Sequence, residues 1–149
     1  MAVVSVTRVH LRSVLHFPAF AWHSFLSASQ ARQADGNLGA IVRQHGGSLW
    51  TMSMWRDEID LRAFMLSGNH RTAMPKLAGW CDEAASARFE TDGDIMPAWN
   101  TAEQVMATRG KLSAVRHPSP AQQKGLTLGT YGQRRGGVFA QPPFVQARA

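Results

Sequence analysis

Cysteine and acidic residues are scarce in this sequence. It has one cysteine, Cys81, and no acidic residue among its first 34 or its last 46 positions. A single cysteine excludes a disulfide within the chain and a metal site built from several thiolates. No apolar run reaches the roughly 18 residues that a membrane-spanning helix needs, and the N-terminal residues lack the continuous apolar stretch of a signal peptide. We therefore predict a cytoplasmic protein without a transmembrane segment.

In other respects the composition is typical of one folded domain. The chain has 149 residues, of which 44% are hydrophobic and 17% are charged, which is enough to bury a sizeable core. Its net charge of +6 is uneven: residues 1–34 carry +3, residues 35–103 carry −4 and residues 104–149 carry +7. A basic C-terminal segment can bind nucleic acid or an anionic surface, or it can be a solvated tail that binds neither. The candidate phosphate contacts are Arg116, Lys124, Arg134 and Arg135.

The hydrophobic pattern predicts four strands and two long helices. Alternating apolar residues predict strands over about residues 2–11, 38–44, 49–55 and 85–91. Helical spacing of apolar residues predicts helices over about residues 18–33 and 102–115. Asp57 is a good N-cap for a further helix, and Gly46-Gly47 predicts a tight hairpin between the second and third strands.

This order of elements matches the ferredoxin-like fold, an α+β fold in which a four-stranded antiparallel sheet carries helices on one face. The bare face must be covered, and pairing two sheets into a dimeric α+β barrel would cover it. We therefore predict a homodimer. Residues 1–117 should form the α+β barrel domain, and residues 118–149 a basic arm rich in Pro and Gly. The arm has too many apolar residues for a free tail, so parts of it should pack on the body or on a partner.

His70 is the first candidate for a catalytic role. It follows the break at Ser67-Gly68 and precedes Pro75, which should end or kink its helix. On a short helix over the sheet, an imidazole can ligate a haem iron or act as a general base. The adjacent Arg71 could hold a carboxylate or a propionate. The alternative is that His70 is a hydrogen-bonded structural residue and that Arg71 is simply exposed.

Bulky, adaptable side chains gather around the third strand and the helix that follows it. Together they could line a cavity for an apolar small molecule, with Met74 close to His70. They could equally form an ordinary core. The other histidines show no metal-ligand spacing, so we predict no metal site. The residues predicted to line the cavity are Trp50, Met52, Trp55 and Phe64.

The stretch from Trp55 to Met74 resembles the signature of spheroidene monooxygenase-like proteins. These are similar to the wider antibiotic-biosynthesis monooxygenase group, with its dimeric α+β barrel. The likeness extends more loosely over residues 3–115. It implies a cavity between sheet and helices in each subunit, with a histidine from the helix after the strand near it, and some members use such a histidine to bind haem. Our candidate cofactor-binding residues are therefore His70 and its neighbours Trp55 and Met74. Other members oxidise a substrate with no cofactor. The matching residues are Trp55, Leu61, Phe64, Ser67, Gly68, His70, Ala73 and Met74.

Two functional hypotheses follow. The first is a monooxygenase-like enzyme acting on an apolar substrate, with His70 as iron ligand or proton-transfer group. The second is a non-catalytic small-molecule binding or scaffold dimer with the same fold. The sequence leaves open whether haem is bound and which substrate is used.

Overall fold

The computed structural model describes residues 1–129, whose strands and helices follow the predicted order, with one short strand and one short helix added after the last long helix. The strands are β1 (Ala2–Leu11), β2 (Asn37–His45), β3 (Ser48–Trp55), β4 (Cys81–Thr91) and β5 (Lys111–Leu112). The helices are α1 (Phe17–Gln33), α2 (Glu58–Met65), α3 (Gly68–Trp80), α4 (Trp99–Arg109) and α5 (Pro120–Gln123), with a 3-10 turn, η1 (Val14–His16), before α1.

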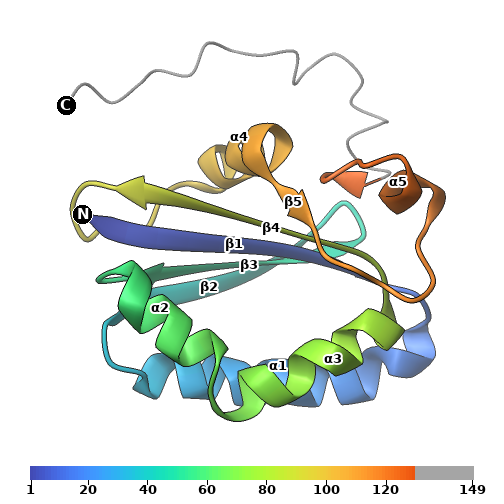
Figure 1. Cartoon of the computed structure of the whole chain (residues 1–149), viewed down its shortest axis with the longest axis horizontal. Helices are drawn as coiled ribbons and strands as arrows, with labels where there is room; N and C mark the ends of the chain where they lie inside the picture. The colour runs from blue at the N-terminus through green and yellow to red at the C-terminus, as the bar shows by residue number, and fades with distance from the viewer. Residues whose placement is uncertain (130–149) are drawn as a thin grey trace.

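The strands form one open antiparallel sheet in the order β2-β3-β1-β4-β5 (Figure 1). β1 lies in the middle, so that Thr7 faces Thr51 of β3 on one side and Ser86 of β4 on the other. The predicted hairpin joins β2 to β3 through Gly46 and Gly47, whose φ angles of 59° and 78° need residues without a Cβ. The architecture is the α+β ferredoxin-like fold that the sequence predicted.

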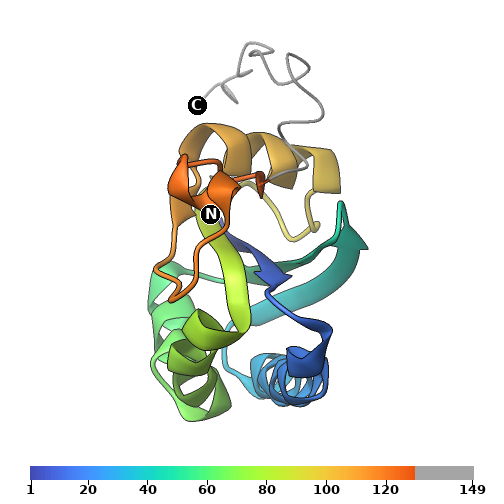
Figure 2. The same cartoon turned by 90° about the vertical axis from the view of Figure 1, so that its right-hand side faces the viewer.

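Helices lie on both sides of this sheet. Figures 1 and 2 show α1, α2 and α3 against one face and α4 over the other. We expected a partner's sheet to cover that second face, but α4 of the same chain covers it. The physical reason is that Ala102, Val105 and Met106 of α4 are fully apolar and pack into a core with the sheet.

The core under α4 holds most of the large buried side chains. Every second residue of β1 and β3 points into it, as the alternation predicted. Its members from the sheet include Val4, Val6, Trp50, Met52, Met54, Ala85 and Ala87. On the opposite face a smaller cluster joins Val3, Ala31, Trp55, Leu61 and Phe64 at one end of the sheet. The rest of that face is much less filled.

Two helices differ from the predicted ones. The helix expected over residues 102–115 ends at Arg109, because Lys111 and Leu112 leave it to pair with β4. A Cβ at Gly110 would also collide with the Met106 carbonyl at the turn. Pro75 does not end its helix: α3 continues through it to Trp80.

The first part of the predicted arm packs on the domain. The Ser119 hydroxyl donates to Glu83 Oε1 at 2.8 Å. Glu83 is paired with Arg8, and these two side chains are only 5% and 2% exposed. Arg8 Nη1 in turn donates to the Thr127 carbonyl at 3.3 Å. A buried ion pair therefore fastens this segment to β1 and β4. The candidate phosphate contacts Arg134 and Arg135 lie outside the described residues.

Within residues 1–129, none of the helices combines the length and the apolar character that crossing a bilayer requires.

Candidate functional site

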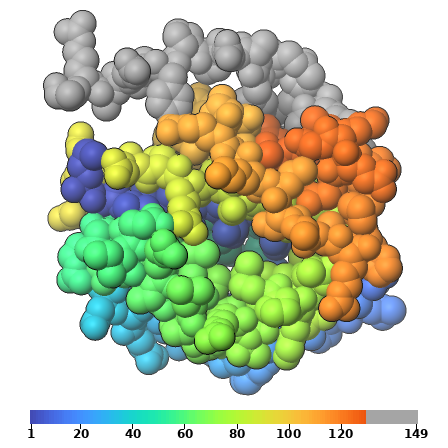
Figure 3. All heavy atoms as spheres, in the orientation of Figure 1, coloured from blue at the N-terminus to red at the C-terminus, as the bar shows by residue number. Residues whose placement is uncertain are grey.

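A cavity of about 350 Å³ lies between the sheet and helices α1 and α3. In the space-filling view a hollow is visible between α3 and the segment after β5, with atoms of β1 at its base (Figure 3). The cavity is bounded by strands β1 to β4, by helices α1, α2 and α3, and by residues 113–115. Its size is in the range of small-molecule sites.

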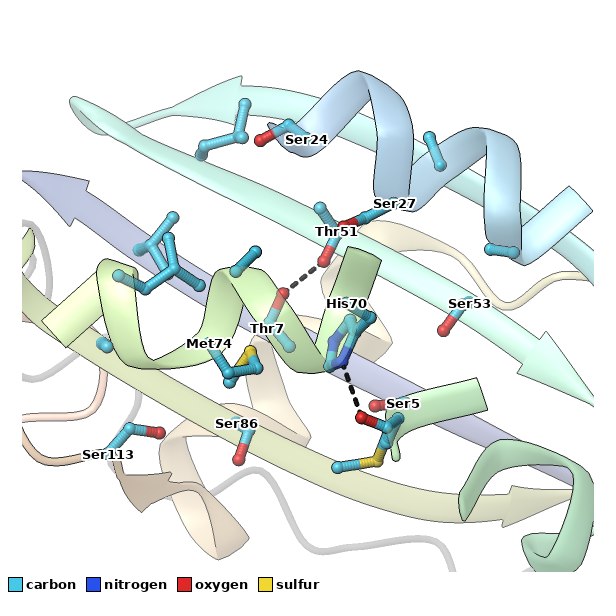
Figure 4. Close-up of a pocket in the computed structure, with 18 of the residues that line it drawn as sticks. Ser5, Thr7, Ser24, Ser27, Thr51, Ser53, His70, Met74, Ser86 and Ser113 are labelled. Carbon is cyan, nitrogen blue, oxygen red and sulfur yellow. Dashed lines mark hydrogen bonds between the residues drawn. The ribbon is translucent and has the colours of Figure 1, made fainter. Parts of the chain in front are cut away.

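The sheet wall of the cavity carries hydroxyl groups. Figure 4 shows them on β1, β3 and β4, on the side that faces the helices. Thr7 and Thr51, on neighbouring strands, share a hydrogen bond between their hydroxyls. Ser53 accepts a hydrogen bond from Trp55 Nε1 at 2.9 Å. We call this set the hydroxyl floor, and its members are Ser5, Thr7, Thr51, Ser53 and Ser86.

The helix wall mixes apolar and polar side chains. α3 contributes Ala73 and Leu77, and α1 contributes Ser24 and Ser27 as well as Phe20 and Ala28. His23 and His70 are the two imidazoles among the described residues that line the cavity. The site therefore combines apolar surface from both walls with hydroxyls, most of them on the sheet, and with two imidazoles on the helix side.

His70 is held in one tautomer. Its Nδ1 lies 3.2 Å from the Met65 carbonyl oxygen, which can only accept, so the proton is on Nδ1. The lone pair is then on Nε2, which makes no hydrogen bond with the described residues. Burial lowers the pKa of His70 from its usual 6.5, and the hydrogen bond to Met65 opposes this only in part. At neutral pH His70 is thus an uncharged imidazole that can take up a proton.

The turn before His70 is organised by a side chain from another helix. Gln30 of α1 accepts the His70 backbone N–H through Oε1 at 2.9 Å. Its Nε2 donates to the Ser67 carbonyl at 2.8 Å. Gly68 between them has φ 54°, and a Cβ there would lie 3.0 Å from the Gln30 side chain. Gln30 therefore sets where α3 begins and where its histidine lies.

Aromatic rings continue from His70 toward the end of the sheet. The His70 and Phe64 ring centroids are 4.7 Å apart, and Phe64 stacks on Trp55 at 4.9 Å. These contacts fix the imidazole plane and keep water from one of its sides.

The structure brings together only some of the predicted site residues. Phe64, His70 and Met74 line the cavity. Met52 borders it, but its side chain belongs to the core under α4. Trp50 lies in that same core, on the other side of the sheet. Trp55 does not line the cavity but packs behind Phe64, and Arg71 is exposed.

His23 and Asn69 are site residues that the sequence reasoning missed. Asn69 Nδ2 donates to the His23 carbonyl at 2.9 Å, and Asn69 Oδ1 lies 3.0 Å from His23 Nδ1. This pair ties α3 to α1 across the helix wall. The hydroxyl floor was missed as well, although it follows the same alternation that identified the strands. That alternation was the available signal: small polar residues at every second position, facing away from Val4 and Val6.

Two further observations concern metals and the Cys81 thiol. The described residues contain no group of three or more side chains placed to hold a metal ion. Cys81 is fully buried, and burial, together with the nearby Asp82 carboxylate, raises the pKa of its thiol to about 12. A thiol in that environment is a poor nucleophile.

Comparison with known proteins gives the fold. No protein-family model matches the chain, and no curated protein matches it. Solved structures do match. A conserved protein from Methanosarcina mazei Go1 has a TM-score of 0.56 at 17% identity, over 62% of this chain and 94% of that one. A putative antibiotic biosynthesis monooxygenase from Nitrosomonas europaea has a TM-score of 0.55 at 14% identity, over 61% and 90%.

A third match is SnoaB, a cofactor-independent oxygenase from Streptomyces nogalater, with a TM-score of 0.52 at 15% identity, over 65% of this chain and 98% of that one. The chain has the fold of the antibiotic biosynthesis monooxygenase-like proteins. This confirms the resemblance that the sequence suggested. At such identities the likeness establishes the fold alone.

Proposed function

We propose that the cavity is the substrate site of a monooxygenase-like enzyme in which His70 is the general base. The observation that carries the proposal is the state of His70: its proton is held on Nδ1 by Met65, and its lowered pKa leaves Nε2 free to accept a proton at neutral pH. A base is most effective when its pKa lies near the working pH. The fold it shares with SnoaB, a cofactor-independent oxygenase, supports the same reaction class.

The chemistry can be written without a cofactor. Nε2 of His70 removes a proton from a methylene group that flanking groups make acidic. The resulting carbanion reduces dioxygen, one oxygen atom is kept as a carbonyl, and the other leaves as water with the two methylene hydrogens. The substrate supplies every electron that dioxygen takes up. The rings of Phe64 and Trp55 limit the access of water to one side of the base. Arg71 has no part in this scheme, because its side chain is exposed.

The donor set fits haem poorly. Haem carries two propionates, and Arg88 supplies the one guanidinium or ammonium group among the described residues that line the cavity. Arg88 is already paired with Glu58. Of the predicted cofactor-binding residues, Trp55 is behind Phe64 rather than in the cavity. We therefore derive no step through haem.

The test is dioxygen consumption with anthrone, whose methylene lies between two aromatic rings. We expect wild-type protein to consume dioxygen and His70→Ala to lose about 100-fold or more of the rate, as is usual for loss of a general base. His117→Ala, which removes an exposed imidazole outside the cavity, is the matched control and should retain activity. A His70→Ala variant with wild-type turnover would rule out the role of His70.

Two other results would assign a different function. A saturable Soret band on haem titration that disappears in His70→Ala would make His70 a haem ligand. Ligand binding with no dioxygen consumption by any variant would support the alternative hypothesis, a non-catalytic small-molecule binding protein.

We also propose that the chain forms a homodimer through α1 and the outer edge of β2. α4 covers the sheet face that we first expected to pair. Exposed apolar side chains lie elsewhere: Trp22 and Phe25 of α1 are 60% and 64% exposed, and Val42 of β2 is 56% exposed. Such a patch and an unpaired edge strand are typical of an interaction surface. Light scattering should give twice the chain mass, and Trp22→Ser/Phe25→Ser should give the mass of one chain.

A further inference from the structure

The hydroxyl floor is unusual because of where it lies. In the middle of β1 and β3 the residues in the core under α4 are Val4, Val6, Met52 and Met54. Between them, Ser5, Thr7, Thr51 and Ser53 lie on the other face and line the cavity. Apolar residues continue that face at its two ends, Val9 and Leu49 at one and Val3 and Trp55 at the other. Both faces of the sheet are covered by helices, and a sheet covered on both faces normally carries apolar residues on both. The overall composition of the strands does not explain why the two faces differ, because the same two strands supply the residues of both faces.

Not all hydroxyls of the floor form hydrogen bonds with other described residues of the protein. Thr7 and Thr51 bond to each other, and Ser53 accepts from Trp55. Ser5 and Ser86 make no side-chain hydrogen bond within residues 1–129. Both side chains are half-buried and line the cavity, so their hydroxyls can form hydrogen bonds with water or with a ligand there.

The floor is also regular. Ser5 lies directly opposite Ser53, and Thr7 lies opposite both Thr51 and Ser86. Opposed side chains on neighbouring strands begin about 5 Å apart, and alternate residues of one strand are about 6.6 Å apart. The helix wall above it carries fewer hydroxyls, those of Ser24 and Ser27, and its apolar residues include Phe20, Ala73 and Leu77.

We infer that the cavity takes a ligand with a hydrocarbon body and at least two hydroxyl or carbonyl oxygens along one side, spaced to meet hydroxyls on neighbouring strands. The oxygens lie on the hydroxyl floor and the hydrocarbon lies against α1 and α3. This differs from the wholly apolar ligand that the sequence suggested, because a pure hydrocarbon would leave Ser5 and Ser86 unpaired. The inference rests on the part of the proposed function that makes the cavity a ligand site, and not on catalysis.

The test compares two rigid probes that differ by one oxygen, 1,3-adamantanediol and 1-adamantanol, by titration calorimetry. We expect wild-type protein to bind the diol roughly 3- to 10-fold more tightly, the value of one added hydrogen bond, although the mono-alcohol is the more apolar molecule. In Ser5→Ala/Ser86→Ala this preference should disappear. Thr91→Val, which removes a hydroxyl from β4 outside the cavity, should keep it.

Thermal melting supplies a second readout. If Ser5 and Ser86 serve a ligand, their replacement by Ala should leave the melting temperature of the free protein unchanged or raise it. A lower melting temperature would mean that the hydroxyls hold the fold together, and the inference would fail. It would fail equally if wild-type protein bound neither probe, bound both alike, or kept its preference in the double variant.

The two proposals fail separately. His70→Ala should keep the preference for the diol, since binding to the floor does not need the base. If the protein does not consume dioxygen with anthrone, the inference about ligand oxygens is not affected. If the two probes bind equally, the proposed role of His70 as general base is not affected.

Discussion

Replacing Glu83 by alanine should destabilise this protein more than any other single charge deletion on the sheet. Glu83 and Arg8 face each other from β4 and β1, with side chains 5% and 2% exposed. Within residues 1–129, the substitution leaves the buried Arg8 guanidinium one hydrogen-bond acceptor, the Thr127 carbonyl. It also removes the acceptor for the Ser119 hydroxyl. Breaking a buried pair from one side costs about 3–5 kcal/mol.

That loss is large against a total stability of about 5–15 kcal/mol for a domain. With a urea m-value of about 2 kcal/mol/M, the unfolding midpoint should fall by roughly 1.5–2.5 M. Arg8→Met/Glu83→Leu, which removes both charges and fills the space, should lose much less. Glu58→Ala breaks the exposed pair with Arg88, whose side chains are 48% and 40% exposed, and should cost at most about 1 kcal/mol.

Urea unfolding followed by tryptophan fluorescence measures all three variants. Hydrogen exchange at the Ser119 amide, which bonds to the Asp82 carbonyl at 3.0 Å, reports whether the segment is released. If Glu83→Ala unfolds at the same urea concentration as Glu58→Ala, the buried pair does not fasten the segment and the reasoning is refuted.

The ion pair between Arg8 and Glu83 also makes the stability of the folded protein depend on pH. Burial alone would raise the pKa of Glu83, but hydrogen bonds from Ser119 and Arg8 and the charges of Arg8 and His10 outweigh it, so the pKa is lowered from 4.5. A lowered pKa in the folded state means that the stabilisation is complete above the unfolded value and is lost as the pH falls through the folded value. Wild-type stability should therefore drop below about pH 4.5. The Arg8→Met/Glu83→Leu variant should lose less over that range.

Three further outcomes are expected. The rate with anthrone should rise with pH through a midpoint below 6.5 and then level off, because the pKa of His70 is lowered by burial; a midpoint above 6.5 would contradict that. Gly68→Ala should cost about 1–3 kcal/mol, because φ is 54° and the new Cβ meets Gln30; an unchanged melting temperature would show that the turn adapts. Cys81 should react with a thiol reagent only after unfolding, since its pKa is about 12.

The strand and helix order could be predicted because it depends on local patterns. Val4, Val6, Trp50 and Met52 alternate with smaller residues, and this periodicity belongs to the strand itself. Asp57 was predicted as an N-cap, and its side chain does accept from the Asp60 N–H at 2.9 Å.

The cavity could not be predicted in the same way. Alternation shows that a strand has two different faces but not which helices will cover each. We assigned Trp50 to the pocket because it is bulky and apolar, whereas bulk fills space and places a residue in the core under α4. A cavity forms where side chains are short, as at Ser5 and Ser86. His70 was found from the sequence because it follows a helix break, but the Gln30 contact that holds it spans 40 positions and leaves no local trace.

The difference between the two faces of the sheet also affects how this protein can evolve. In the middle of β1 and β3, an even-numbered residue such as Val6 or Met54 contributes to folding, and an odd-numbered one such as Ser5 or Thr51 contributes to what is bound. In β4 the order is reversed, with Ser86 on the binding side. Mutations at the second kind of position can alter ligand preference while the packed face keeps the chain folded. Specificity in this protein can therefore drift faster than its architecture.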